Sequence, residues 1–243
     1  MGEVSQRSTD QPGMTERTGS RAESGAGVPA GDTLRRRIQR FVVSGPLVVH
    51  AIIASAFLVL LIPFVQTGPT WSSDEGAVRA QVEVIAVEGS WSRVRPFSEL
   101  DPAELISPIH ASTINGDQYY PYTNRPAYPM ALVPLRSRFG QGAVVLPSIL
   151  GAVLAAVAGA QIAGLLSDRI RILTFWILVA GSPLFFYAYI VKAHTVAAAA
   201  STLAVLVVLR ASNRGLLASV AAGGLIFVAV LLRAEAVLFG AAL

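Results

Sequence analysis

The chain has 243 residues, of which 53% are hydrophobic and only 14% are charged, and its net charge is +4. This balance is too apolar for an ordinary soluble domain and indicates a membrane protein, so nucleic acid is not an expected partner. The sequence has no cysteine, which excludes disulfide, thiol and cysteine–metal chemistry.

Residues 1–34 are rich in Gly, Ser, Thr, Arg and Glu and nearly lack large apolar side chains. Such a composition cannot bury enough apolar surface to offset the entropy of ordering. We therefore expect a disordered cytoplasmic tail over 1–34 and a transmembrane domain over 35–243. A basic collar precedes the first apolar run and is typical of the cytoplasmic flank of a membrane span; it consists of Arg35, Arg36, Arg37 and Arg40.

Long intervals without Asp, Glu, Lys or Arg locate the expected spans, because a spanning helix needs about 20 mainly apolar residues. The spans are predicted near 45–66, 142–166, 172–190, 193–209 and 215–232, and a sixth begins at 236–243. The predicted fold is an all-α polytopic transmembrane helix bundle. The first apolar run is too long for a secretory signal peptide and favours a retained anchor in the lipid bilayer.

Basic residues in the short loops set the orientation, since Lys and Arg favour the cytoplasmic side. Arg169, Arg171, Arg210 and Arg214 follow the second and fourth spans, which places these loops on the same side as the basic collar. The N-terminus is then cytoplasmic, and loop 67–140 is extracytoplasmic. The ionisable residues expected on the extracytoplasmic side are Asp74, Glu75, Asp117, Lys192, His194, Arg233 and Glu235.

The extracytoplasmic loop begins with "SSDEGAVRAQVEVIAVEG", residues 72–89. Ser72 and Glu75 have the spacing of a capping box, and Gly89 is suited to end the helix. Val78, Val82 and Ile85 recur at helical spacing, which predicts an amphipathic helix over 74–88 lying in the membrane interface, with Trp71 and Trp91 at its ends. Asp74 and Glu75 are either a functional pair or ordinary acids of a first helical turn.

The second distinctive stretch of the loop, residues 115–140, is rich in tyrosine and proline. Its prolines exclude a regular helix through most of it. The tyrosines have two readings. They form an aromatic belt at the membrane interface, or Tyr119, Tyr120 and Tyr122 belong to a loop that binds a sugar or a polyprenyl phosphate.

Taken in order, these stretches resemble the membrane glycosyltransferases of the GT-C superfamily. The resemblance rests on Asp-Glu-Gly at 74–76, "GDQYYPYTNRPAYPMALVPLRSRFG" at 116–140, "KAHTVAAAASTLAVLVVL" at 192–209 and "LLRAEAVLFGAAL" at 231–243. It is greatest for the branch with protein O-mannosyltransferases and the lipid A aminoarabinose transferase, and it covers residues 45–243. Because family members are longer, the resemblance implies that this chain is the N-terminal part, whose C-terminal half is either missing or a separately encoded partner.

The resemblance implies transfer of a sugar from a polyprenyl-phosphate donor to an extracytoplasmic acceptor. Asp74 matches the proposed base or metal contact, Glu75 follows it in the same motif, and "RAE" at 233–235 matches an Arg-Pro-Glu motif with Ala234 in place of proline.

The residue chemistry agrees with this role. A carboxylate can take the proton of an acceptor hydroxyl, and Arg233 and Lys192 can neutralise a phosphate leaving group. His194 and Glu235 complete the predicted donor-phosphate site. His194 could orient the phosphate or help Asp74 or Glu235 hold a divalent cation, or it could simply begin a helix. His50 and His110 are assigned no role.

Two other functions remain open from the sequence. A transporter would carry ionisable residues within its spans and paired broken helices; the span interiors lack charge, and only "AGSPLF" at 180–185 indicates a break. A non-catalytic or truncated multi-pass membrane protein is the other alternative.

The predicted orientation can be tested with cysteines introduced at Ser73 and Ser212, because the natural chain has no cysteine. An impermeant thiol reagent applied to intact cells should label Ser73→Cys and should leave Ser212→Cys unlabelled until the membrane is permeabilised. Labelling of Ser212→Cys alone would reverse the orientation.

Overall fold

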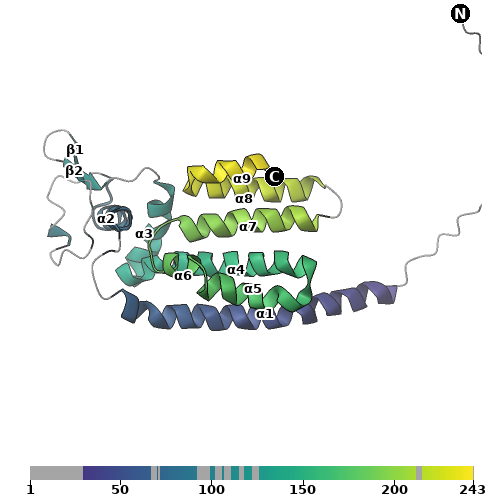
Figure 1. Ribbon diagram of the computed structural model, residues 1–243. Helices are drawn as coiled ribbons and strands as arrows, with labels where there is room; N and C mark the ends of the chain where they lie inside the picture. The colour runs from purple at the N-terminus through teal and green to yellow at the C-terminus, as the bar shows by residue number, and fades with distance from the viewer. Residues whose placement is uncertain are drawn as a thin grey trace, which may run out of the picture. The chain divides into compact units, whose positions relative to one another are not determined.

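The computed structural model describes residues 30–66, 70, 72–91, 99–101, 106, 111–114, 118–121, 126–211 and 215–242 (Figure 1). The chain divides into two compact units, residues 1–41 and 42–243, and each is considered by itself. In the first unit the structure describes residues 30–41, which are helical. The predicted disorder over 1–34 is therefore wrong for residues 30–34, and residues 1–29 lie outside the described part.

The described chain is predominantly helical, as predicted. Its elements are α1 (Ala30–Val65), α2 (Ser73–Glu88), β1 (Ala111–Ile114), β2 (Gln118–Pro121), α3 (Ala127–Phe139), the 3-10 helix η2 (Gln141–Val145), α4 (Leu146–Leu166), α5 (Asp168–Ala180), α6 (Leu184–Tyr187), α7 (His194–Arg210), α8 (Leu216–Leu232), the 3-10 helix η3 (Ala234–Ala236) and α9 (Val237–Ala242). The strands β1 and β2 pair antiparallel, with Ser112 opposite Tyr120. The expectation of a purely helical chain missed this short pair.

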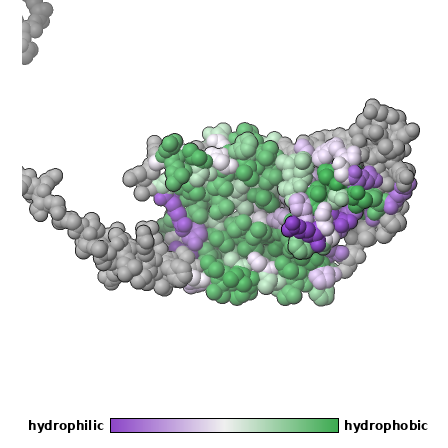
Figure 2. Space-filling model, turned by 180° about the vertical axis from the view of Figure 1, so that it is seen from behind, coloured by the Kyte–Doolittle hydropathy of each residue, from purple (hydrophilic) through white to green (hydrophobic). Residues whose placement is uncertain are grey.

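Among the described residues, two helical segments are by length and composition apolar enough to cross a membrane: Gly45–Val65 and Gln141–Leu166. The helices α7 and α8 are apolar but have only 17 residues each. At 1.5 Å per residue such a helix is about 25 Å long, slightly less than the ~30 Å hydrocarbon core of a bilayer. Figure 2 shows apolar side chains over the middle of the helices and hydrophilic ones toward their two ends.

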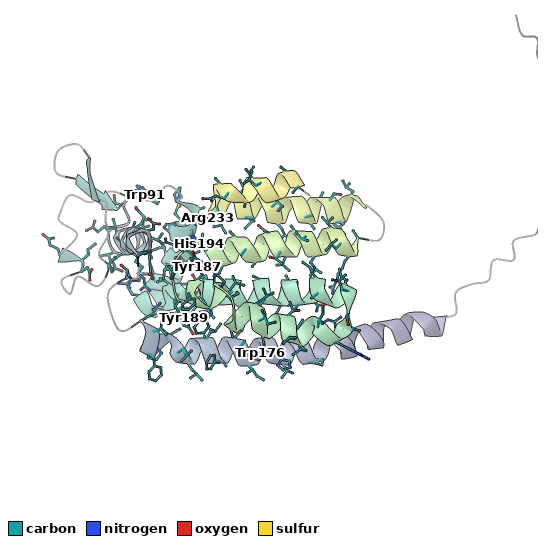
Figure 3. The ribbon with its side chains drawn as sticks, viewed as in Figure 1. Trp91, Trp176, Tyr187, Tyr189, His194 and Arg233 are labelled. Carbon is teal, nitrogen blue, oxygen red and sulfur yellow. The ribbon has the colours of Figure 1, made fainter. Side chains whose placement is uncertain are left out.

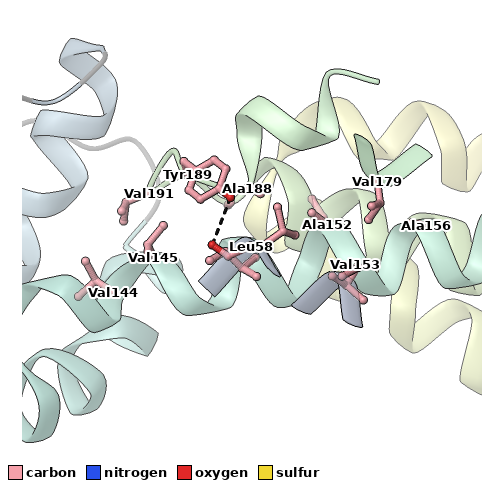
Figure 4. Close-up of a cluster of buried hydrophobic side chains, with 14 of the residues drawn as sticks. Leu58, Val144, Val145, Ala152, Val153, Ala156, Val179, Ala188, Tyr189 and Val191 are labelled. Carbon is pink, nitrogen blue, oxygen red and sulfur yellow. Dashed lines mark hydrogen bonds between the residues drawn. The ribbon is translucent and has the colours of Figure 1, made fainter. Parts of the chain in front are cut away.

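The long helix α4 lies between α5 and α7 and packs closely against both (Figure 1). Small residues of α4 are buried there, including Gly151, Ala152 and Ala156. A Cβ at Gly151 would come within 2.6 Å of the backbone nitrogen of Val196 in α7, so only glycine permits this approach. Figure 4 shows Ala152, Val153 and Ala156 in the resulting core. Small residues of this kind allow close helix packing where water does not drive association.

The predicted span 172–190 is not one helix, which corrects the sequence analysis. The helix α5 ends at Ala180, and the one-turn helix α6 begins only at Leu184. Pro183 lacks a backbone N–H and so cannot continue the helix. The Ser182 hydroxyl binds two backbone groups beside the break: it donates to the Leu178 carbonyl (2.5 Å) and accepts from the Leu184 N–H (3.2 Å).

The helix α2 begins and ends as predicted. The Ser72 hydroxyl accepts a hydrogen bond from the Glu75 N–H (3.3 Å), and Gly89 ends the helix at φ 65°. Glu83, in the second half of α2, is buried. Figure 1 shows α2 along its own axis, whereas α4, α7 and α8 run across the view, so α2 lies crosswise to these helices.

The contact at Gly151 predicts a stability difference between two glycines. Gly151→Ala should lower the stability by about 1–3 kcal/mol, because its added methyl group collides with the backbone of α7. Gly223→Ala is the matched control, since a Cβ at Gly223 of α8 meets nothing within 4 Å. Thermal unfolding in detergent, followed by circular dichroism, measures both; equal midpoints would contradict the close packing of α4 on α7.

Candidate functional site

The non-helical residues 188–193, between α6 and α7, carry one half of the candidate site. Side chains from distant parts of the sequence form hydrogen bonds with the backbone of this segment. Gln66, just after α1, donates to the Tyr189 carbonyl (3.1 Å), and the Tyr189 hydroxyl donates to the Leu58 carbonyl (3.2 Å). Tyr189 and Val191 are buried beside the core (Figure 4). Because buried backbone groups need partners, these bonds fix the path of the segment.

Tyr128 and Ser148 hold the same segment from α3 and α4. The Ser148 hydroxyl donates to the Lys192 carbonyl (3.3 Å), so its oxygen is left to accept from the Tyr128 hydroxyl (3.1 Å). Both side chains are buried, and burial raises the pKa of Tyr128 to about 12. The phenol therefore stays protonated and able to donate near neutral pH. Neither Tyr128 nor Ser148 was predicted as a site residue.

Glu75 links α2 to this segment and differs from its neighbour Asp74. Its carboxylate is buried and accepts hydrogen bonds from the Val191 N–H (3.2 Å) and from Arg79 (3.0 Å). A carboxylate enclosed in this way has no open side for an acceptor hydroxyl. The geometry thus favours a positioning role for Glu75 over the catalytic role predicted from the sequence.

Asp74 meets Lys192 at the surface beside this link. The Lys192 ammonium lies 2.8 Å from Oδ2 of Asp74, although the two residues are far apart in sequence. The Asp74 side chain is 80% exposed and that of Lys192 only 16%. The hydrogen bond and charge of Lys192 lower the pKa of Asp74, with smaller contributions from His194 and Arg233. Asp74 is thus ionised at neutral pH and accessible.

The other half of the site is built around His194, the first residue of α7, and Arg233, which follows α8. Nη1 of Arg233 lies 3.0 Å from Nδ1 and 2.5 Å from Nε2 of His194. The Tyr187 ring stacks on the His194 ring, with centroids 4.8 Å apart and an angle of 14° between the planes. Figure 3 shows these three side chains together near α2. An arginine N–H can only donate, so the ring nitrogen that binds it must be unprotonated.

Glu235 completes this half of the site. The Nε and Nη2 atoms of Arg233 lie 3.1 and 3.0 Å from the two Glu235 oxygens, a bidentate ion pair. Asp74, Lys192, His194, Arg233 and Glu235, all predicted from the sequence, are therefore brought to one end of the helices. Tyr187 is an addition that the sequence analysis missed, since nothing in its local pattern distinguishes it from other aromatic residues.

An ion pair between the buried Glu83 and the partly buried Arg136 anchors α2 on α3 and was not predicted from the sequence. Arg136 donates two 2.6 Å hydrogen bonds to the two oxygens of Glu83, and Gln141 donates a third. A signal was available, because Glu83 stands within an apolar stretch of α2 and needs a cation if that stretch is buried.

The predicted aromatic residues are only partly described. Tyr119 and Tyr120 lie in β2, and Tyr122, Trp71, His110 and Asp117 lie outside the described residues. His50 accepts a hydrogen bond from the Trp176 indole (3.2 Å). Within the part of the chain that the structure describes, no group of three or more His, Asp or Glu residues could hold a metal ion.

No protein-family model matches the chain, and neither a curated protein nor a solved structure matches it. The resemblance to the GT-C superfamily therefore remains a prediction from the sequence motifs.

The anchor of α2 can be tested at Arg136. Arg136→Ala should destabilise the protein by about 3–5 kcal/mol and speed hydrogen exchange in α2, because Glu83 would be left buried without its cation. Arg138→Ala, which removes an exposed arginine of the same helix, is the control. Replacing both Glu83 and Arg136 with Met should lower the free energy of unfolding much less than Arg136→Ala does, because no unpaired charge is left buried. Equal effects of Arg136→Ala and Arg138→Ala would contradict this anchor.

Proposed function

We propose that the chain is a GT-C type membrane glycosyltransferase, which transfers a sugar from a polyprenyl-phosphate donor to an extracytoplasmic acceptor. The observation that supports this is the convergence of Asp74, Lys192, His194 and Arg233. These residues come from α2, the segment before α7, the start of α7 and the end of α8. They combine an exposed carboxylate with the cations that a phosphate leaving group needs.

The proposal includes a polytopic arrangement in the cell membrane, with a cytoplasmic N-terminus and the site at the extracytoplasmic end. Basic residues at the opposite end of the helices support this orientation: Arg171 pairs with Asp168 at the start of α5, and Arg210 binds Gln161 at the end of α7. The crosswise direction of α2 also supports it (Figure 1). If α4, α7 and α8 span the bilayer, α2 runs along its surface.

In the proposed reaction an acceptor hydroxyl attacks the anomeric carbon of the donor sugar. The new bond joins the acceptor oxygen to that carbon, and the bond from the carbon to the phosphate oxygen breaks. Asp74 takes the hydroxyl proton, and the polyprenyl phosphate leaves with the bonding electrons. Lys192 and Arg233 stabilise the negative charge of the phosphate, while His194 and Tyr187 orient Arg233.

A transporter is the second candidate, because the helical run between α5 and α7 is interrupted on both sides of the one-turn helix α6. Interrupted helices often line substrate sites in transporters. The sequence of the apolar helices lacks charged residues away from their ends, however, and the polar residues gather at one end rather than at the middle. This arrangement favours chemistry at a membrane surface over passage through the membrane.

The proposed function predicts different effects for three substitutions. Asp74→Asn should lower transfer by about 10²–10⁴-fold with little loss of donor binding, because the amide keeps the shape but cannot accept a proton as a base. Arg233→Ala should weaken donor binding as well as transfer, because it removes a phosphate contact. Glu75→Gln should act mainly through stability.

The measurement is transfer of labelled sugars from polyprenyl-phosphate donors, including mannose and aminoarabinose, by membranes containing each variant. Donor binding is measured on the same membranes, and protein amount and thermal stability serve as controls. Transfer by Asp74→Asn at the wild-type rate would refute the catalytic role of Asp74.

A further inference from the structure

The charged groups of the site differ in how firmly they are held. The cations are mostly covered: the side chain of Lys192 is 16% exposed and that of Arg233 is 33% exposed. Their carboxylate partners are mostly exposed, 80% for Asp74 and 66% for Glu235. The cations are therefore fixed parts of the site, and the carboxylates are the partners that can leave.

The fixed position of the cations has a structural cause. The backbone of Lys192 is bound by Ser148, and the guanidinium of Arg233 lies against the His194 ring, which Tyr187 supports by stacking. Neither contact depends on Asp74 or Glu235. Departure of the two carboxylates would leave the Arg233 guanidinium against His194 and the backbone of Lys192 in place.

Glu235 occupies the part of Arg233 that a phosphate would use. Its two oxygens bind Nε and Nη2 of the guanidinium, while Nη1 faces His194. Phosphate binds the same pair of N–H groups in the same bidentate geometry. Glu235 and a phosphate cannot both hold this edge, so the sequence-based assignment of Glu235 as a donor-phosphate ligand does not fit the geometry.

We propose that Asp74 and Glu235 are displaceable anions that pair with Lys192 and Arg233, and that the phosphate of the donor replaces them when it binds. This inference rests on the proposed function and deepens it. Glu235 becomes a specificity-determining residue, because a ligand must offer anionic oxygens to both cations to displace both carboxylates. The binding free energy of a ligand with a single weak anionic group is too small to displace both carboxylates.

The exchange costs little, because exposed ion pairs contribute little net free energy in water. Both carboxylates regain hydration when they leave, whereas the mostly covered cations exchange one anion for another. The exchange also has a consequence for Asp74. The hydrogen bond from Lys192 is the largest cause that lowers the pKa of Asp74, so transfer of Lys192 to the phosphate makes Asp74 a stronger base once the donor is bound.

The experiment measures binding of farnesyl phosphate, a short polyprenyl phosphate, to the full chain in lipid nanodiscs by titration calorimetry. Glu235→Gln should bind this probe about three- to fivefold more tightly than the wild type, because a weak competing ion pair has been removed. Asp168→Asn is the matched control, since it also removes an exposed carboxylate from an arginine, but at the far end of the helices. It should bind like the wild type.

Arg233→Ala separates this inference from the proposed function. If Arg233→Ala binds more weakly than the wild type but Glu235→Gln shows unchanged or weaker binding, Glu235 is not a competitor and the inference is overturned, while the phosphate site stands. If no variant binds farnesyl phosphate, or if Arg233→Ala binds like the wild type, the phosphate site itself fails and the inference fails with it. Tighter binding by both Glu235→Gln and Asp168→Asn would indicate a general charge effect and would also overturn the inference.

Discussion

The hydrogen bond between the Glu75 carboxylate and the Val191 N–H is the contact on which the candidate site depends. A buried carboxylate without partners is costly, and so is a buried backbone N–H outside a helix. Each of these groups satisfies the other, and Arg79 completes the bonding of Glu75. Because Asp74 precedes Glu75 and Lys192 follows Val191, this one contact brings the exposed carboxylate and the ammonium group together.

Two features place residues 188–193 beside α2. The helix before this segment is interrupted, and the helix α7 after it packs tightly on α4. Pro183 ends the helical run that begins at α5. Gly151 lets the backbone of α7 approach α4 closely, which fixes the start of α7 and with it His194. The side chains of Gln66 just after α1, Glu75 of α2 and Ser148 of α4 then satisfy polar backbone groups between these two points. Irregular backbone of this kind persists within a helical protein only where other groups complete its hydrogen bonds.

Charge in the site is balanced internally, and this balance shapes its chemistry. Asp74 pairs with Lys192 and Glu235 with Arg233, so each cation of the site has a carboxylate partner from the chain itself. The carboxylates are more exposed than the cations. Another anion can therefore replace the hydrated carboxylates while the covered cations stay. Under the proposed function, the same four charges stabilise the protein without substrate and receive a phosphate when the donor arrives.

The sequence by itself determined features that depend on local chemistry. Ser72 and Gly89 set the two ends of α2 through capping, and charge-free intervals predicted α4, α7 and α8 to within one or a few residues. The motif residues Asp74, Lys192, His194, Arg233 and Glu235 were also identified from the sequence, although their pairing was not.

Only the tertiary structure decided which of these residues touch, and in what roles. Asp74 and Glu75 are neighbours in one helical turn, yet packing exposes the first and buries the second. The position of Glu83 in an apolar stretch indicates that it needs a cation, but only the packing of α3 on α2 makes that cation Arg136. The stacking of Tyr187 on His194 joins residues whose local patterns do not indicate a partner. Capping and periodicity act within a few residues, whereas burial and ion pairing depend on segments that meet only when the helices pack.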